Sequence, residues 1–310
     1  DGAVDMASTL VVASTINTVG ITGAKTNFVG SMLISNDAGT GTLDAASNNT
    51  GFGNEVFDDL TSGDNNTGVG AQALSKLTTG TGNLAVGKDA GLGITTGDQN
   101  VAIGFEALKT EDTGSSSVAV GALALATQNA GDGDHYNTAV GRKAGFAVTT
   151  GTNNTFIGGL AGVANTTGSQ NIAVGGLAGD ALTTGSNNTA VGYLALSAED
   201  TRSDSTAVGY RALTAQNADT GNAYNVAIGT DAALSLTTGN RNVYVGALSG
   251  DANVTGDGNT ALGHNTLSTN THSENNVAVG YEALKTFNIG SGSGYNVAVG
   301  SVAGTALTTG

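Results

Sequence analysis

The sequence predicts an all-β fold: a repetitive β-solenoid, or β-roll, built from 17-residue and occasionally 20-residue coils. A glycine that follows an aliphatic or aromatic residue recurs fifteen times, and the residue number rises by 17 in eleven of the steps and by 20 in three. The residues before each glycine are mostly β-branched, as in pleated strands. A unit this small must stack on its neighbours to bury a core. The repeated glycines are Gly53, Gly70, Gly87, Gly104, Gly121, Gly141, Gly158, Gly175, Gly192, Gly209, Gly229, Gly246, Gly263, Gly280 and Gly300.

Residues 1–46 do not follow the repeat, and we expect them to form a separate β-rich lead-in segment. Runs at 8–12 and 27–30 are rich in strand-forming residues, and the sequence at 20–23, which has glycine at both ends, predicts a turn. The segment is expected to lead directly into the repeat.

Residues 47–310 are the predicted repeat rod of about fifteen units. The chain ends on Thr308-Thr309-Gly310, which occupies the turn that should precede another unit. We therefore expect the rod to be truncated in mid-repeat, as a piece of a longer polypeptide.

Positions in the unit are counted from the repeated glycine, so that position −2 lies two residues before it. Positions −1 and −3, which are aliphatic or Thr in nearly every unit, share one face of a strand, and position −2, usually Ala, lies on the other. Because position −2 stays small, we expect the Ala face to meet a close neighbour. The glycine permits a sharp corner or a backbone contact that a Cβ would block.

A single chain of this kind is expected to have too few large apolar side chains in each coil to fill a core by itself. Ordering the backbone of one coil costs roughly 17–34 kcal/mol, whereas one fully buried large side chain returns only about 1.5–3 kcal/mol. Lateral packing of identical chains would bury the Ala face as well. The sequence therefore favours an intertwined or laterally packed homotrimer, because three chains suit rotational symmetry about a fibre axis.

Position −4 is Asn in thirteen units and Ser, at Ser117 and Ser205, in the other two. Stacked coil over coil, these side chains predict an amide ladder along the axis, as in cross-β assemblies. We expect this role to be structural. Besides Asn49, the predicted ladder comprises Asn66, Asn83, Asn100, Asn137, Asn154, Asn171, Asn188, Asn225, Asn242, Asn259, Asn276 and Asn296.

The composition excludes several classes of protein. The chain has 310 residues, 50 Gly, no Pro, no Cys and a formal net charge of −15. Nucleic acid needs a basic face, so it is not an expected partner. No stretch is long and apolar enough to predict membrane insertion, and the strict register of the repeat argues against disorder.

No motif predicts an enzyme, a cofactor or a metal. His135, His264 and His272 fall at different positions in their units without a ligand spacing, and we expect surface or packed histidines. The acidic pairs Asp58-Asp59 and 132–134 lack the ligand series of calcium loops. We expect solvated loop carboxylates, and no catalytic, cofactor-binding or metal site.

Segments such as Asn100-Val101-Ala102-Ile103-Gly104 and Asn276-Val277-Ala278-Val279-Gly280 resemble the signature of the left-handed β-roll heads of trimeric autotransporter adhesins. The longer pattern N-T-A-V-G-x-x-A-L-x-x-x-T-T-G is similar to repeats in bacteriophage tail fibres. This resemblance implies an extracellular virion protein: the structural shaft of a tail fibre, contacting other virion tail proteins and serving host attachment. The alternative is a bacterial surface adhesin or an extracellular structural filament on the cell surface.

Two features are candidates for recognition. Each 20-residue unit has Tyr directly before its Asn, namely Tyr136, Tyr224 and Tyr295, beside an inserted loop. Protruding loops are frequent binding sites, and Tyr offers a stacking face for a host cell-surface glycan; alternatively, each ring only covers the kink of the insertion. The Thr-Thr-Gly segments are expected to be turns, and stacked turns would form a Thr-rich stripe. The alternative is that this stripe binds ice or glycan in a single-chain solenoid.

Overall fold

The computed structural model describes residues 20–23, 28–29, 31–35, 44–198, 201–217 and 221–308. The β-rich run expected at 8–12 lies outside these residues. The chain divides into two compact units, residues 1–136 (unit 1) and 137–310 (unit 2). Each is described by itself below.

Unit 1 is all-β in the residues that the structure describes. Its strands are β1 (Gly20–Gly23), β2 (Phe28–Val29), β3 (Met32–Ser35), β4 (Ala46–Ser47), β5 (Thr50–Phe52), β6 (Thr67–Val69), β7 (Leu84–Val86), β8 (Val101–Ile103), β9 (Gly114–Ser115), β10 (Val118–Val120) and β11 (Gly133–Asp134). The strands β3, β5, β6, β7, β8 and β10 pair in that order as a parallel ladder. Two short parallel pairs, β2 with β4 and β9 with β11, lie outside the ladder.

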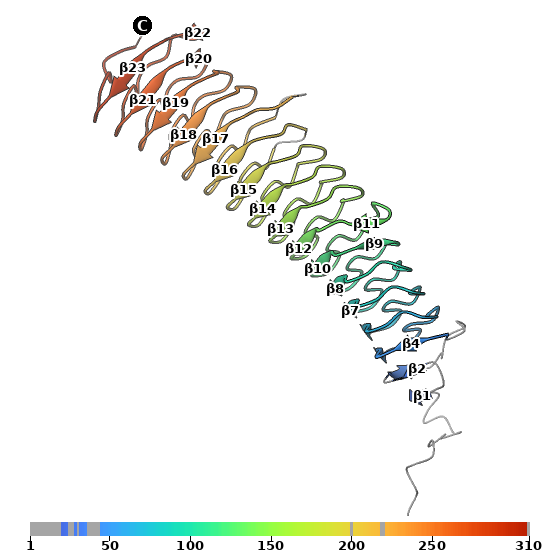
Figure 1. Cartoon of the computed structure of the whole chain (residues 1–310). Helices are drawn as coiled ribbons and strands as arrows, with labels where there is room; N and C mark the ends of the chain where they lie inside the picture. The colour runs from blue at the N-terminus through green and yellow to red at the C-terminus, as the bar shows by residue number, and fades with distance from the viewer. Residues whose placement is uncertain are drawn as a thin grey trace, which may run out of the picture. The chain divides into compact units, whose positions relative to one another are not determined.

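Unit 2 repeats this design (Figure 1). Its strands are β12 (Thr138–Val140), β13 (Thr155–Ile157), β14 (Ile172–Val174), β15 (Thr189–Val191), β16 (Thr206–Val208), β17 (Val226–Ile228), β18 (Val243–Val245), β19 (Thr260–Leu262), β20 (Ser273–Glu274), β21 (Val277–Val279), β22 (Gly292–Ser293) and β23 (Val297–Val299). All of them except β20 and β22 form one parallel ladder in chain order. The strands β20 and β22 pair with each other.

The register of the ladders confirms the predicted β-solenoid. Each strand pairs with the strand one repeat further along, so that equivalent positions stand over one another: Ala173 pairs with Ala190, and Ala190 with Ala207. Each coil therefore advances by one strand spacing, about 4.8 Å.

The turn expected at 20–23 is wrong, because these residues form β1. This strand pairs antiparallel with β3, with Gly20 opposite Ser35 and Gly23 opposite Met32. The central Ile21-Thr22 pair is β-branched and suits an extended backbone. Pairing with β1 covers the outer edge of β3, an edge that would otherwise present unpaired backbone groups. The strand expected within 27–30 is present as β2.

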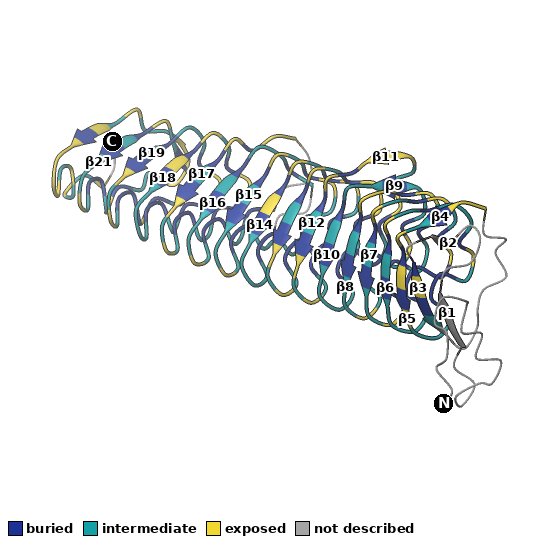
Figure 2. Cartoon of the chain, turned by 60° about the horizontal axis from the view of Figure 1, so that its bottom comes forward, coloured by how far each residue is buried: buried dark blue, intermediate teal, exposed yellow. Residues whose placement is uncertain are grey.

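The expected orientation of the strands is also wrong. The Ala at position −2 faces the interior of its own coil: Ala173, Ala190 and Ala207 are fully buried within the single chain. Positions −1 and −3 face outward, as the buried middle residue of each strand shows (Figure 2). The Ala face is therefore not the surface that meets a neighbouring chain.

The repeated glycine stays small because of close backbone packing, as expected. In unit 2 a Cβ on Gly175 would lie 2.6 Å from the carbonyl oxygen of Gly192 in the next coil. The φ angle of Gly175 is 135°, in a region that other residues rarely adopt. Each coil thus turns its corner directly over the corner of the next.

The interior of each coil is filled by a few positions whose sizes compensate one another. Position −2 packs against positions +4 and +7 of the same coil. Where position −2 is glycine, at Gly51, position +4 is the large Phe57, whose ring lies 3.0 Å from the place of the missing Cβ. Where position −2 is Phe156, position +4 is Gly162, whose missing Cβ leaves the space that the ring occupies. Large side chains alternate between positions so that every coil keeps a dense core.

The two aromatic residues at position −2 differ in how they satisfy a buried amide at position +7. The amide nitrogen of Asn253 donates to the hydroxyl of Tyr244. In the equivalent coil, the amide atoms of Asn165 beside Phe156 are buried without a hydrogen-bond partner. A buried polar group left without a partner costs about 1–3 kcal/mol.

We therefore predict that Phe156→Tyr stabilises the protein, because the added hydroxyl reaches the amide of Asn165. The matched change Tyr244→Phe should destabilise it by about 1–3 kcal/mol, because it leaves the Asn253 amide with fewer partners. Urea unfolding of the two variants and the parent measures both effects. The explanation fails if Phe156→Tyr lowers stability or if Tyr244→Phe leaves it unchanged.

Candidate functional site

The asparagines at position −4 form a ladder inside each unit, interrupted once in each by Ser117 or Ser205. The side chain of Asn171 shows the pattern: its amide nitrogen donates to the carbonyl of Gly185 at 2.8 Å, and its oxygen accepts the backbone N–H of Asn188 at 3.0 Å. In unit 1, Asn66 and Asn83 bond in the same way. Each side chain therefore ties the start of a strand to the turn of the next coil. The ladder members are buried, except Asn296, which is half-buried.

The two units with Ser at position −4 replace the missing amide from position +7. Ser117 accepts a hydrogen bond from the amide nitrogen of Gln128 at 2.8 Å. Ser205 accepts an equivalent bond from Gln216, also at 2.8 Å, and Gln216 in turn accepts from Asn225. Both glutamines are fully buried. The sequence contained this signal, because Ser and Gln stand at the same spacing, i and i+11, in both units.

The tyrosines of the long coils stand on the surface, and two of their hydroxyls are hydrogen-bonded to the adjacent loop. All three have positive φ angles, between 49° and 52°. The hydroxyl of Tyr136 donates to Asp134 at 2.9 Å, and the hydroxyl of Tyr224 accepts from Asn222 at 2.8 Å. Tyr295 is 76% exposed. Their faces are accessible, but Tyr224 and Tyr295 are four coils apart in unit 2, so no two of the three are neighbours in a coil stack within one unit.

The first inserted loop is held by a buried ionisable pair. The Nδ1 atom of His135 lies 3.2 Å from the carboxylate of Glu111, and its Nε2 atom lies 3.0 Å from the carbonyl of Gly131. Gln128 donates to the same carboxylate at 2.6 Å. Each ring nitrogen has an oxygen acceptor, which favours the protonated imidazolium. The amide nitrogen of Gln128, a donor, also lies 3.2 Å from Nδ1. The hydrogen bond to Glu111 raises the pKa of His135, although burial opposes the shift.

The remaining candidate histidines and acidic pairs do not come together. His264 stacks on Tyr281 with ring centroids 5.7 Å apart, and His272 is exposed. Asp134 accepts hydrogen bonds from Ser116 and Tyr136, which lower its pKa. Among the described residues there is no cluster of three or more His, Cys, Asp or Glu arranged to hold a metal ion.

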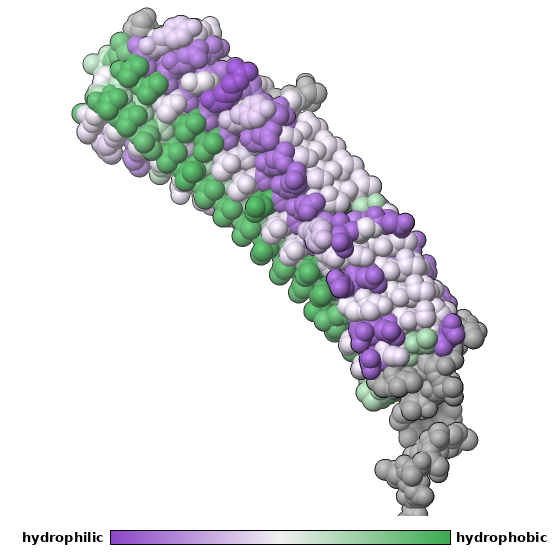
Figure 3. All heavy atoms as spheres, viewed as in Figure 1, coloured by the Kyte–Doolittle hydropathy of each residue, from purple (hydrophilic) through white to green (hydrophobic). Residues whose placement is uncertain are grey.

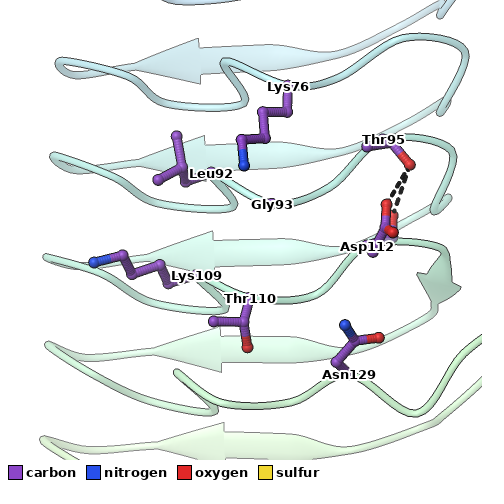
Figure 4. Close-up of a pocket in the computed structure, with 8 residues that line it drawn as sticks. All are labelled: Lys76, Leu92, Gly93, Thr95, Lys109, Thr110, Asp112 and Asn129. Carbon is purple, nitrogen blue, oxygen red and sulfur yellow. Dashed lines mark hydrogen bonds between the residues drawn. The ribbon is translucent and has the colours of Figure 1, made fainter.

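A hollow of about 360 Å³ lies on the surface of unit 1 (Figure 4). It opens where Gly93 interrupts the side chains between Lys76 and Thr110. Asp112 lies at its rim with its carboxylate turned toward the hydroxyl of Thr95, to which it is hydrogen-bonded. The hydroxyl of Thr110 is engaged with the carbonyls of residues 126 and 128. Sequence reasoning missed this hollow, because its lining comes from four successive coils.

Comparison with protein-family models, curated proteins and solved structures finds no match to this chain. No helix within the described residues is both long and apolar enough to cross a membrane. What the chain does must therefore be inferred from its own surfaces.

We predict that Asn171→Ala destabilises the protein by about 1–3 kcal/mol, because the N–H of Asn188 and the carbonyl of Gly185 both lose a buried partner. Thr167→Ala, on the exposed turn that leads into the strand after Asn171, should change stability by less than about 0.5 kcal/mol. Thermal unfolding followed by circular dichroism compares the two. Equal effects would show that the Asn ladder is not a main source of stability.

We also predict a pH dependence that originates at His135. A pKa raised by folding stabilises the fold at pH values below the unfolded pKa, about 6.5, and this contribution is lost as pH rises through the higher folded pKa. NMR titration of the imidazole should give a midpoint above 6.5. The stability difference between the parent and His135→Gln should shrink from pH 6 to pH 9, and a constant difference would contradict the charged pair.

Proposed function

We propose that the chain is a structural segment of a homotrimeric fibre, the shaft of a bacteriophage tail fibre that positions host-receptor binding. The observation that carries the proposal is an uncharged outward stripe, called the aliphatic stripe and defined as positions −1 and −3 of the ladder strands. Position −1 is aliphatic throughout unit 2, and position −3 is aliphatic or Thr. In unit 2 it follows the strand side as a hydrophobic band (Figure 3). Among its members, Ile157 is 39% and Leu262 47% exposed.

The aliphatic stripe is unusual for a free surface. Positions −1 and −3 hold no charged residue in any of the fifteen units, although the chain has 10 basic and 25 acidic side chains besides its histidines. Large contiguous apolar patches on soluble proteins mark interaction sites. A symmetric partner with the same periodicity would match the stripe coil by coil, and three chains close such an interface around an axis.

A fibre shaft acts mechanically. In-register stacking sets the reach of the assembly, and symmetry presents each weak receptor contact in several copies, which raises the effective concentration of a surface glycan. The same properties serve a bacterial surface adhesin, which remains the alternative. Labelling with an antibody against this chain separates the two: electron microscopy should mark phage tails under the first proposal and the bacterial surface under the second.

We predict that charges on the aliphatic stripe dissociate the trimer. The combined change Ile157→Lys, Ile228→Lys and Leu262→Lys places cations at position −1 of three coils, where they would be buried without partners at the interface. Multi-angle light scattering should give a trimer for the parent and a monomer for the variant.

The matched control adds the same charge to the exposed turns, as Thr167→Lys, Thr238→Lys and Thr255→Lys, and should remain a trimer. If the stripe variant is still a trimer, the stripe is not part of the interface. A monomeric parent would favour a single-chain solenoid and overturn the fibre proposal.

A further inference from the structure

A second row of side chains runs along unit 2 at position +1, directly after the corner glycine. The paired strands β12, β13, β14, β15 and β16 place these residues over one another at steps of about 4.8 Å. In order along the stack they are Arg142, Gly159, Gly176, Tyr193 and Tyr210. The row thus has a cation at one end, two coils without a side chain, and two aromatic rings.

One face of the Tyr193 ring packs against Tyr210, and the other side of the ring faces Gly176. The two tyrosine rings are stacked, with centroids 6.1 Å apart and planes 10° from parallel. The guanidinium of Arg211 lies 5.6 Å from the centre of the Tyr210 ring and covers part of it. On the other side, the ring edge of Tyr193 overhangs Gly176, where a Cβ would be 3.4 Å away. Tyr193 is 50% exposed, so part of its surface remains free although the ring stacks on Tyr210.

The space beyond the ring is open. A Cβ added to Gly159 would meet no atom within 4 Å, and the φ angle of Gly159 is not in the left-handed region. The backbone therefore does not require glycine there. Arg142 and Tyr193 are three strand spacings of about 4.8 Å apart along the stack. The Tyr193 ring covers the spacing next to it, so the other two spacings leave about 10 Å for a ligand.

The charge around this space is opposite to that of the chain. Positions +1 and +2 of the five coils from Gly141 to Gly209 hold Arg142, Lys143 and Arg211 and no acidic residue. Arg211 pairs with Asp231 of the following coil at 3.4 Å, so Arg142 and Lys143 supply the positive charge beside Gly159. The whole chain has only ten Lys and Arg and a net charge of −15. Arg142 is exposed and makes no ion pair with a described residue. Lys143 lies over the ring of Phe146, at 5.3 Å.

We propose that this row is a binding subsite for an acidic sugar, a pyranose that carries a carboxylate. The apolar face of the sugar stacks on the ring of Tyr193, and the sugar extends over Gly159. Its carboxylate pairs with the guanidinium of Arg142. Tyr rings offer flat contact area at low entropic cost, and Arg pairs with a carboxylate through two parallel hydrogen bonds. The site lies on a single chain and does not depend on the proposed trimer.

The test is saturation-transfer NMR and titration of the full chain with methyl β-glucuronide as the acidic probe and methyl β-glucoside as the neutral one. The parent should bind the glucuronide at least tenfold more tightly than the glucoside. Gly159→Gln fills the open space without backbone strain and should abolish binding of both. Ala247→Gln, at position +1 of another coil, is the matched control and should bind like the parent.

Two further variants assign the roles. Tyr193→Ala should weaken both probes at least tenfold, whereas Arg142→Gln should lower the affinity for the glucuronide to that for the glucoside. Light scattering on each variant reports assembly separately, so loss of the trimer and loss of the sugar are distinguishable. Absence of glucuronide binding by the parent, or binding that survives Gly159→Gln, would overturn the subsite. Equal affinity of the parent for both probes would overturn its acidic specificity.

Discussion

The stacking of each coil directly over the next is the constraint on which the rest of the structure depends. At the corner, the glycine of one coil lies so close to the glycine carbonyl of the next that a Cβ does not fit. At the start of the strand, Asn171 ties its own coil to the next through both of its amide atoms. These two contacts recur in nearly every coil and together fix the register.

Because the corner and the amide ladder fix the backbone, the interior can vary. Phe156 with Gly162 and Gly51 with Phe57 are two solutions to the same filling problem within a coil. The replacement of Asn by Ser at position −4 is accompanied by Gln at position +7, which supplies the lost amide. Such compensation keeps buried polar groups satisfied, as a low-dielectric interior requires.

The same constraint turns each unit position into a row on the surface. A residue at position −1 contributes to the aliphatic stripe, and one at position +1 stands beside its equivalents at one strand spacing. Single substitutions therefore have meaning only in the context of the row: a side chain at Gly159 would enter the open space between Arg142 and Tyr193. The proposed association through the stripe and the proposed recognition through the position +1 row would use different positions of the unit.

The sequence by itself determined the all-β solenoid, the length of the coil and the role of the corner glycine, because a strict short period with β-branched runs has few other solutions. It could not decide which strand face is inside, since a three-residue run alternates equally well either way. Only the tertiary structure showed that Ala190 lies inside and that the aliphatic residues face outward. The residues 20–23 became a strand because β3 offered an edge to pair with. The burial of His135 beside Glu111 was decided by tertiary packing, because it joins side chains that are 24 residues apart.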